Sequence, residues 1–138
     1  MNKGLFTSKT GEWETPQWLF DQLNKKFRFD IDVCATKKNA KCKKFYTKKD
    51  DGLKMGWYGN VWCNPPYGRE IKKWVEKAFL ESHKGIIVML LPARTDTKWF
   101  HNWLYKKRNI EIIFIKGRLK FGNSKNSAPF PSMIVIIK

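Results

Sequence analysis

Acidic residues are scarce in this chain of 138 residues. Aspartate and glutamate number 12 against 28 lysines and arginines, so the formal net charge is +16. So large a positive charge favours a polyanionic partner, and nucleic acid above all. Codon bias in an AT-rich genome would also favour lysine, but it explains the choice of lysine over arginine better than the shortage of acids.

Long hydrophobic runs and cysteines are also in short supply. No apolar run approaches the roughly 20 residues that span a bilayer, and the N-terminus leads into no signal-peptide core, so we expect a cytoplasmic protein. Cys34, Cys42 and Cys63 are odd in number and match no zinc-ligand spacing. We expect them to be reduced, mostly buried thiols, and we expect no metal.

The remaining composition is that of one folded domain. An apolar content of 42% with 15% aromatic residues supports one hydrophobic core and argues against disorder. The length leaves no room for an appended target-recognition domain, so residues 1–138 are expected to form a single domain. Residues 1–12 are polar, and we expect them to be flexible.

The spacing of apolar residues predicts an α/β fold. Thr15 is expected to cap the first helix, with Pro16 at its first position. Further helices are expected over 70–82 and from Thr95-Asp96 to about Lys107, and strands over 29–35, 59–63, 85–91, 110–115 and 133–137. Alternating strands and helices indicate an open, mostly parallel sheet, here with an antiparallel terminal strand. Ligands of such sheets bind beyond the carboxyl ends of the strands, where Asp32, Asn64 and Arg94 are expected.

One motif has an unusual chemistry: Asn64-Pro65-Pro66-Tyr67, directly after the apolar run Val61-Trp62-Cys63. Neither proline donates a backbone hydrogen bond, so the strand must stop there with the chain held extended. The side-chain oxygen of Asn64 and a main-chain carbonyl at Asn64 or Pro65 can then accept the two hydrogens of an exocyclic amino group. Tyr67 can stack on the base that carries that group. A proline-rich turn with an exposed tyrosine would contain the same four residues, so other segments must decide.

At this motif the chain resembles the amino-methyltransferases, and specifically the small phage-type DNA N6-adenine methyltransferases of the Dam family. Further segments carry the same resemblance in the same order: Trp13-Glu14-Thr15-Pro16, Asp32 with Cys34-Ala35, Asn39-Ala40-Lys41, 91–100, 117–121 and 128–132. The usual glycine-rich turn after the first strand is missing, and only about 25 residues separate Ala35 from Asn60. The resemblance therefore implies a compact, Rossmann-like methyltransferase fold whose cofactor half is truncated.

The resemblance also implies a cofactor, an acceptor and the residues that bind them. S-adenosyl-L-methionine would donate the methyl group to adenine in DNA, and the target base would be flipped out of a duplex or lie in a single strand. The implied catalytic residues are Asn64, Pro65, Pro66 and Tyr67. The implied cofactor-binding residues are Trp13, Thr15, Pro16, Asp32, Cys34, Ala35, Asp51 and Asn64. The implied nucleic-acid contacts are Tyr67, Arg94, Arg118, Lys120 and Phe121.

Several alternatives stay open at this point. An ordinary solvated turn explains Asp51 as well as a contact to the adenosine does. The same four-residue motif occurs in enzymes that methylate glutamine side chains or RNA adenines; the positive charge argues against a protein substrate but does not separate DNA from RNA. A catalytically decayed methyltransferase fold that only binds nucleic acid is favoured by the missing glycine-rich turn and opposed by the intact motif.

Overall fold

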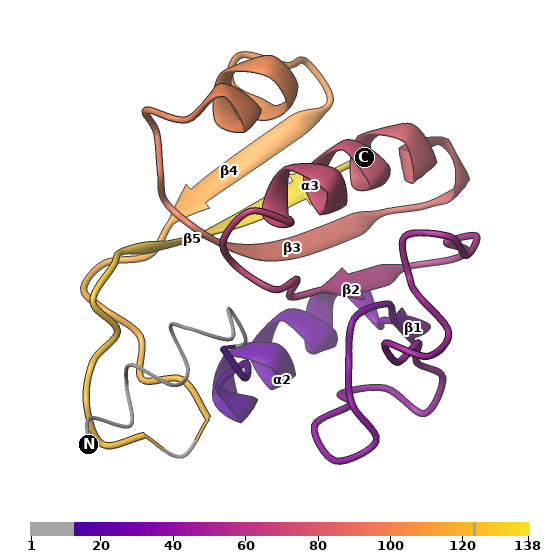
Figure 1. Ribbon diagram of the computed structural model, residues 1–138, viewed down its shortest axis with the longest axis horizontal. Helices are drawn as coiled ribbons and strands as arrows, with labels where there is room; N and C mark the ends of the chain where they lie inside the picture. Colours follow the sequence, from indigo (N-terminus) through magenta and orange to yellow (C-terminus); the bar gives the residue numbers. More distant parts are fainter. Residues whose placement is uncertain (1–12, 123) are drawn as a thin grey trace.

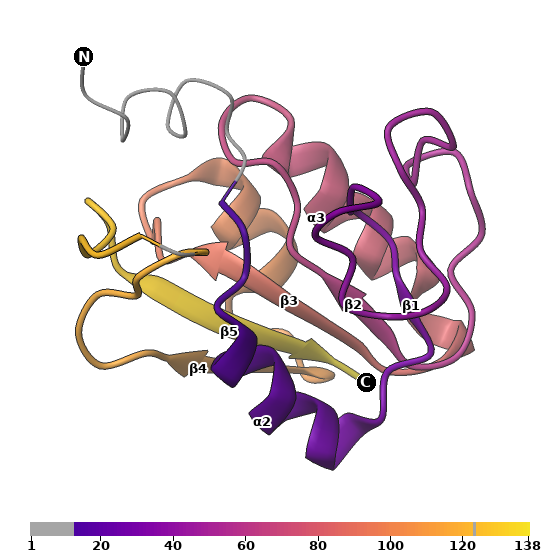
Figure 2. The same cartoon turned by 90° about the horizontal axis from the view of Figure 1, so that it is seen from below.

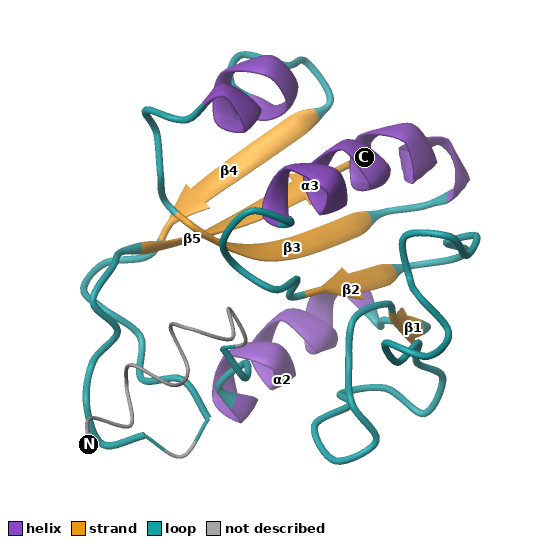
Figure 3. Ribbon diagram, in the orientation of Figure 1, coloured by secondary structure: helices purple, strands orange, loops and turns teal. Residues whose placement is uncertain are grey.

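A five-stranded sheet organises the fold. A computed structural model describes residues 13–122 and 124–138, and Figures 1 and 3 show its elements. The strands are β1 (Ile31–Asp32), β2 (Val61–Cys63), β3 (Ile87–Pro92), β4 (Ile110–Phe114) and β5 (Ser132–Ile137), in the spatial order β1-β2-β3-β5-β4. The expected flexible segment, residues 1–12, lies outside the described residues.

The sheet has a parallel half and an antiparallel half. Strands β1, β2 and β3 are parallel, and β5 is antiparallel to both of its neighbours, β3 and β4. Every residue of β3 and β5 is buried, as expected for continuous apolar strands covered on both faces. The prediction of a mostly parallel sheet whose last strand along the chain is antiparallel is confirmed, and β5 lies inside the sheet rather than at its edge.

Helices cover both faces of the sheet. α2 (Gln17–Phe27) lies on one face, whereas α3 (Ile71–Glu81) and the helical turn η2 (Phe100–Leu104) lie on the other (Figures 1 and 2). A short 3-10 turn, η1 (Ser82–Lys84), follows α3. α2 packs through Phe20, whose ring centroid is 5.5 Å from that of Trp62 in β2. Among the described residues, no helix is both long and apolar enough to cross a bilayer.

The first helix and the first strand are shorter than their sequences predict. α2 begins at Gln17 with Pro16 as its N-cap, and Thr15 makes no capping bond because its hydroxyl accepts a hydrogen bond from Asn64 instead. β1 ends at Asp32 because the Asp32 carboxylate accepts the main-chain N–H groups of Cys34 and Lys41, which turns the chain out of the sheet. The predictions of a Thr15 cap and of a strand over 29–35 are therefore wrong at these positions.

The third predicted helix is also shorter and has a different winding. Helical backbone covers only 98–104, and within it Phe100–Leu104 is a π-helix, in which the Tyr105 N–H donates to the Phe100 carbonyl at 2.9 Å. The Thr97 hydroxyl, not Thr95 or Asp96, accepts the N–H of Phe100. The prediction that this helix reaches Lys107 is wrong.

The truncation of the cofactor half is confirmed. Residues 36–59 are all described and contain no helix or strand, only an isolated bridge that joins Phe45 to Asp32. This segment therefore borders β1 where further strands of a larger sheet would lie.

Candidate functional site

A cleft of about 960 Å³ lies at the carboxyl ends of β1 and β2, within the size range of small-molecule sites. The parallel strands explain its place, because their carboxyl ends meet at one edge of the sheet. The cleft is lined by most of the residues that the sequence predicts for cofactor and catalysis: Trp13, Thr15, Asp32, Cys34, Ala35, Asp51, Asn64, Pro65 and Pro66. Pro16, Tyr67, Arg94, Arg118, Lys120 and Phe121 are not among its lining residues.

The side-chain amide of Asn64 has a defined orientation. Its Nδ2 donates to the main-chain carbonyl of Trp13 and, at 2.9 Å, to the hydroxyl of Thr15. A main-chain carbonyl can only accept, so the amide nitrogen must occupy this side. The opposite atom, Oδ1, is buried and has no hydrogen-bond partner among the described residues. The amide therefore offers an acceptor with unused capacity in the wall of the cleft.

Asp32 places a second polar group in the cleft. Its side chain is 3% exposed, and its two oxygens accept the main-chain N–H groups of Cys34 at 3.2 Å and Lys41 at 3.1 Å. Burial raises the pKa of Asp32 to about 6, although both N–H groups and the Lys41 ammonium act in the opposite direction. A carboxylate with a pKa this high is costly to keep charged, which is typical of residues that meet a ligand rather than water.

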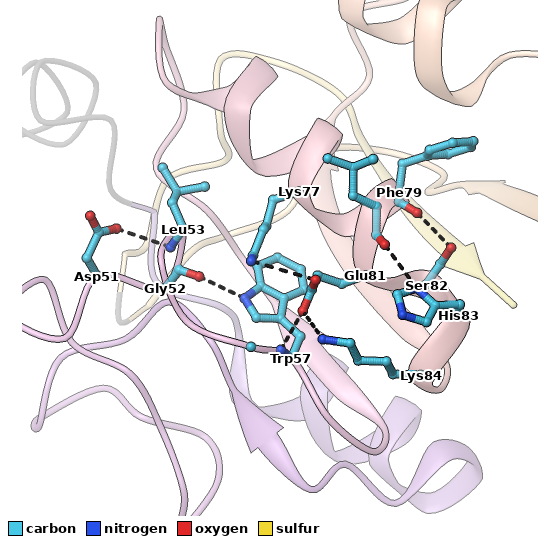
Figure 4. A network of polar contacts seen from close by, with 12 residues as sticks. Asp51, Gly52, Leu53, Trp57, Lys77, Phe79, Glu81, Ser82, His83 and Lys84 are labelled. Atoms are coloured by element: carbon cyan, nitrogen blue, oxygen red, sulfur yellow. Dashed lines mark hydrogen bonds and ion pairs between the residues drawn. The ribbon is translucent and has the colours of Figure 1, made fainter.

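The loop that carries Asp51 is tightly constrained. Asp51 has a left-handed backbone (φ 62°), and its Oδ1 accepts the N–H of Leu53 at 3.1 Å. Gly52 follows because no larger residue fits: a Cβ there would lie 2.2 Å from the Val33 carbonyl oxygen. The indole of Trp57 donates to the Gly52 carbonyl at 2.8 Å (Figure 4). These contacts hold the backbone at Asp51 in a fixed position at the cleft.

Glu81 at the end of α3 anchors the same loop from behind (Figure 4). One carboxylate oxygen accepts the Trp57 N–H at 2.7 Å and pairs with the Lys84 ammonium at 2.8 Å, while the other lies 3.8 Å from Lys77. Burial alone would raise the pKa of Glu81, but these hydrogen bonds and charges outweigh burial and lower it. The cleft wall is thus tied to the helix that follows the Asn-Pro-Pro-Tyr motif.

Tyr67 is buried instead of facing the cleft. Its ring is 7% exposed, its hydroxyl donates to the Leu90 carbonyl at 3.0 Å, and burial raises its pKa well above the usual value. Its ring contacts those of Phe121 and Phe130, with centroids 6.4 and 5.6 Å away. Trp13 also packs edge-on against both phenylalanines. We refer to Trp13, Tyr67, Phe121 and Phe130 as the aromatic cluster.

The basic residues predicted to contact nucleic acid lie around the aromatic cluster. Arg94 is exposed and its guanidinium carbon is 6.0 Å from the ring centroid of Phe130. Arg118 is exposed and its Nη1 donates to the Ala128 carbonyl at 3.4 Å, and Lys120 is exposed beside it in the chain. The structure thus separates the predicted site residues into two groups, one lining the cleft and one on the aromatic cluster, with Trp13 in contact with both.

The sequence reasoning missed several residues of the cleft. Trp74 and Glu70 line it from the start of α3, and its other unpredicted members include Glu14, Thr36, Asn39 and Tyr46. The amphipathic pattern of residues 70–82 assigned Trp74 to the core, and it does pack there, with its ring centroid 6.1 Å from that of Trp57. The hydrophobic pattern of a helix identifies a core residue, but it does not show whether that residue also lines a cleft.

Cys63 and Cys42 are not activated as thiolate nucleophiles. Cys63 is buried, and burial raises its pKa well above the usual value, so it remains a neutral thiol. Burial likewise raises the pKa of Cys42 to about 12. Within residues 13–122 and 124–138, no cluster of His, Cys, Asp and Glu side chains is arranged to hold a metal ion.

Comparisons with known proteins agree on one family. The sequence pattern of the family described as DNA N-6-adenine-methyltransferase (Dam) matches residues 4–138. A protein of Haemophilus phage HP1 named DNA N-6-adenine-methyltransferase is 33% identical over 137 residues, which cover 91% of this chain and 78% of the relative. A protein of Escherichia phage T1 with the same name is 36% identical over 113 residues, which cover 78% of this chain but 45% of that longer relative.

Proposed function

Because the chain belongs to the DNA N-6-adenine-methyltransferase (Dam) family, we propose that it transfers a methyl group from S-adenosylmethionine to the N6 amino group of adenine in DNA. The observation at the site that carries this proposal is the buried oxygen of Asn64, an acceptor without a partner among the described residues. An amino group that presents two hydrogens is the ligand that such an acceptor lacks. DNA as the acceptor would place the reaction in the cytoplasm of a bacterial host.

The residues of the cleft fit S-adenosylmethionine. Asp32 and Asp51 offer carboxylates to the hydroxyl and amino groups of the adenosine, with Cys34 and Ala35 between them along the wall. Trp13 and Thr15 would contact the methionine end, at the point where the chain enters α2. When bound, the cofactor supplies an electrophilic methyl group on a positively charged sulfur, so the protein needs no metal or covalent nucleophile for this reaction.

The catalytic contribution of the protein is electrostatic. Asn64 Oδ1 accepts one hydrogen of the adenine amino group, and the main-chain carbonyl of Asn64 or Pro65 accepts the other. As the nitrogen bonds the methyl carbon, the carbon–sulfur bond of the donor would break and the nitrogen would gain positive charge. Both acceptors would stabilise that charge until the nitrogen loses one proton to water. Fixed dipoles that face a developing charge commonly contribute about 3 kcal/mol each. Trp13 and Thr15 keep the amide in the orientation that this role requires.

Tyr67 would stack on the target adenine once the aromatic cluster separates. At 7% exposure neither face of the ring is open to a base, so Phe121 or Phe130 must move aside when the base enters. Stacking of a base on an aromatic ring contributes about 1–3 kcal/mol, enough to exchange one ring contact for another. A base inside a duplex cannot reach this position, so we infer base flipping or a single-stranded target.

Methyl transfer from labelled S-adenosylmethionine to unmethylated DNA, followed by digestion to nucleosides, tests the proposed function. We expect label in N6-methyladenine. The variant Asn64→Ala should lose at least about 100-fold in kcat, as removal of a comparable fixed donor does elsewhere, while its melting temperature stays close to that of the wild type. Asn102→Ala, on the exposed surface of η2, is the matched control.

Three other outcomes of this assay would each support a different conclusion. Label in RNA but not in DNA would change the acceptor and leave the chemistry at Asn64 intact. Full turnover by Asn64→Ala would remove the amide from the mechanism. Absence of both transfer and cofactor binding would favour a decayed fold that only binds nucleic acid.

A further inference from the structure

Residues 112–138 and residues 33–49 both contain several basic residues and no aspartate or glutamate. Residues 112–138 include Arg118 and Lys120, which the sequence already assigns to nucleic acid. The second stretch, residues 33–49, has no assigned role beyond the cofactor contacts at its start, although it contains seven lysines: Lys37, Lys38, Lys41, Lys43, Lys44, Lys48 and Lys49. We refer to residues 36–49 as the lysine segment.

The lysine segment lies on the opposite side of the site from the 112–138 stretch. Lys37, Lys41, Lys48 and Lys49 line the cleft that contains Asn64. Trp13 lines the same cleft and contacts Phe121 and Phe130 of the other stretch. Figure 2 shows the lysine segment on one side of the chain that leads into α2 and the loop between β4 and β5 on the other. The catalytic asparagine therefore lies between two positively charged surfaces.

The backbone of the lysine segment is held in place. Thr36 and Asn39 exchange hydrogen bonds, from the Thr36 N–H to the Asn39 side chain at 2.7 Å and from the Asn39 N–H to the Thr36 hydroxyl at 3.1 Å. Lys37 and Lys38 are exposed at the tip of this turn. Further along, the Asp32 N–H donates to the Lys44 carbonyl at 3.1 Å, which fixes the chain beside β1. The positive charges are thus carried on an ordered frame.

Four of these lysines form no ion pair with an acidic residue that the structure describes. The ion pairs between described residues involve Lys54, Lys73, Lys77, Lys84 and Lys138, and none involves Lys37, Lys38, Lys43 or Lys44. All four side chains are exposed. Each exposed ammonium group that contacts a DNA phosphate can displace about one of the counterions condensed on the DNA.

We propose that the lysine segment is a phosphate-binding surface, so that the DNA backbone lies across the mouth of the cleft between residues 36–49 and residues 116–122. The proposal rests on the proposed function, because it takes DNA as the partner. It assigns to the lysine segment the backbone contacts that position a duplex without reading its sequence. Base recognition remains with the groups around Asn64 and Tyr67.

The salt dependence of DNA binding tests this proposal. The site variants are Lys37→Gln/Lys38→Gln and Lys43→Gln/Lys44→Gln. The matched control is Lys25→Gln/Lys26→Gln, an equally exposed adjacent pair in the last turn of α2, at the end of that helix far from Asn64. For each protein the Kd of one unmethylated duplex is measured from 50 to 200 mM salt, with S-adenosylhomocysteine present. Melting temperatures establish that the variants are folded.

We expect each site pair to reduce the slope of log Kd against log salt by up to about 1.8, since each phosphate contact contributes about 0.9. The control should keep the wild-type slope. Wild-type slopes in both site pairs, or an equal reduction in the control, would show that only the diffuse net charge acts and would overturn the proposal. Unchanged slopes combined with weaker binding of S-adenosylhomocysteine would assign the lysines to the cofactor instead.

The two proposals fail in distinguishable ways. If the wild type binds DNA with slopes that fall in the site pairs but transfers no methyl group, the phosphate-binding surface stands and the enzymatic function does not. If the wild type methylates adenine while the site pairs keep its slope, the enzymatic function stands and the lysine segment has no part in DNA binding.

Discussion

At the scale of single residues, the contacts of Asn64 explain why a polar segment far away in the sequence matters for the motif. Two groups from residues 13–15 accept hydrogen bonds from the amide nitrogen, so the orientation of Oδ1, the proposed catalytic acceptor, depends on the entry to α2. Thr15 is 4% exposed and its hydroxyl is committed to this contact. We therefore propose that Thr15, which lines the cleft, is also a positioning residue for Asn64.

Replacement of Thr15 tests this positioning role. Thr15→Val keeps the shape but removes the acceptor, and a hydrogen bond contributes about 0.5–1.5 kcal/mol, so kcat should fall by up to about tenfold. The Kd for S-adenosylhomocysteine should change little. Thr15→Ser, which retains the hydroxyl, is the control and should restore kcat. A raised Kd with unchanged kcat would instead make Thr15 a cofactor contact only.

The pKa of Asp32 predicts a pH-dependent cofactor affinity. Burial raises this pKa from 3.8 to about 6, so the carboxylate that would accept hydrogen bonds from the cofactor forms only as the pH rises from about 5 to 7. Affinity for S-adenosylhomocysteine, measured by calorimetry, should increase over that interval. The Asp32→Asn variant should bind S-adenosylhomocysteine more weakly than the wild type at pH 7, and its affinity should not increase over this pH interval. An identical pH profile in both proteins would exclude Asp32 as the titrating group.

The raised pKa of Asp32 affects the free energy of unfolding in the opposite direction to cofactor affinity. The folded protein holds the Asp32 proton more tightly than the unfolded chain does, because its pKa is raised. The contribution of Asp32 to the free energy of unfolding is therefore largest below about pH 4 and decreases as the pH rises towards 6. Ligand affinity and stability thus respond to Asp32 in opposite directions.

At the scale of elements, the sequence predicted the strands and helices that have a regular apolar pattern. It did not predict the element ends that depend on side-chain hydrogen bonds. The continuous run that forms β3 and the 3.6-residue spacing of α3 fixed these elements within about two residues. The end of β1 depends on which backbone groups the Asp32 carboxylate accepts, and the start of α2 depends on a contact between Thr15 and Asn64. Such contacts form only when distant segments meet, so no local sequence pattern predicts them.

The link between α3 and the Asp51 loop gives a prediction at this scale. Glu81→Gln keeps an acceptor for the Trp57 N–H but loses the charge that pairs with Lys84 and Lys77. The free energy of unfolding at pH 7 should fall by about 1 kcal/mol, the difference between a charged and a neutral hydrogen bond. Cofactor affinity should also fall, because the loop that carries Asp51 is less firmly held.

Urea unfolding of Glu81→Gln and of the exposed control Glu76→Gln measures this effect. Because the pKa of Glu81 is lowered in the folded state, its contribution is present above the usual pKa of 4.5 and disappears as the pH falls through the lower, folded value. The two variants should therefore differ at pH 7 and converge in acid. Equal stability at pH 7 would show that the network adds nothing to the fold.

At the scale of the whole molecule, the sequence predicted the location of the site but not the burial of Tyr67 in the aromatic cluster. Asp32 and Asn64 could be placed at one sheet edge because parallel strands end together, and both line the cleft. The burial of Tyr67 could not be foreseen, because Phe121 and Phe130 reach it from a loop more than 50 residues later in the chain. The catalytic and binding roles of these residues remain predictions.

Ligand-induced stabilisation tests whether the shortened cofactor half is functional. S-adenosylhomocysteine at 100 times its Kd should add about 2.7 kcal/mol to the free energy of unfolding, and the melting temperature should rise by several degrees. Asn64→Ala should retain most of this rise, since its defect is expected in catalysis. A melting temperature that does not respond to the ligand would indicate a fold that has lost cofactor binding.

The oxygen of Asn64, which has no partner in the part of the chain that the structure describes, also affects which bases the site can bind. A buried acceptor that stays unpaired costs about 1–3 kcal/mol, and a purine that carries a carbonyl in place of the amino group would set one oxygen against another. Sites that hydrogen-bond a substrate group can reject analogues without it by about 10⁴-fold or more. Hypoxanthine, the deamination product of adenine, has no amino group to methylate, and its carbonyl oxygen would face the Asn64 oxygen that we propose accepts the amino hydrogen of adenine. We therefore expect this damaged base to bind the site poorly and not to occupy the enzyme.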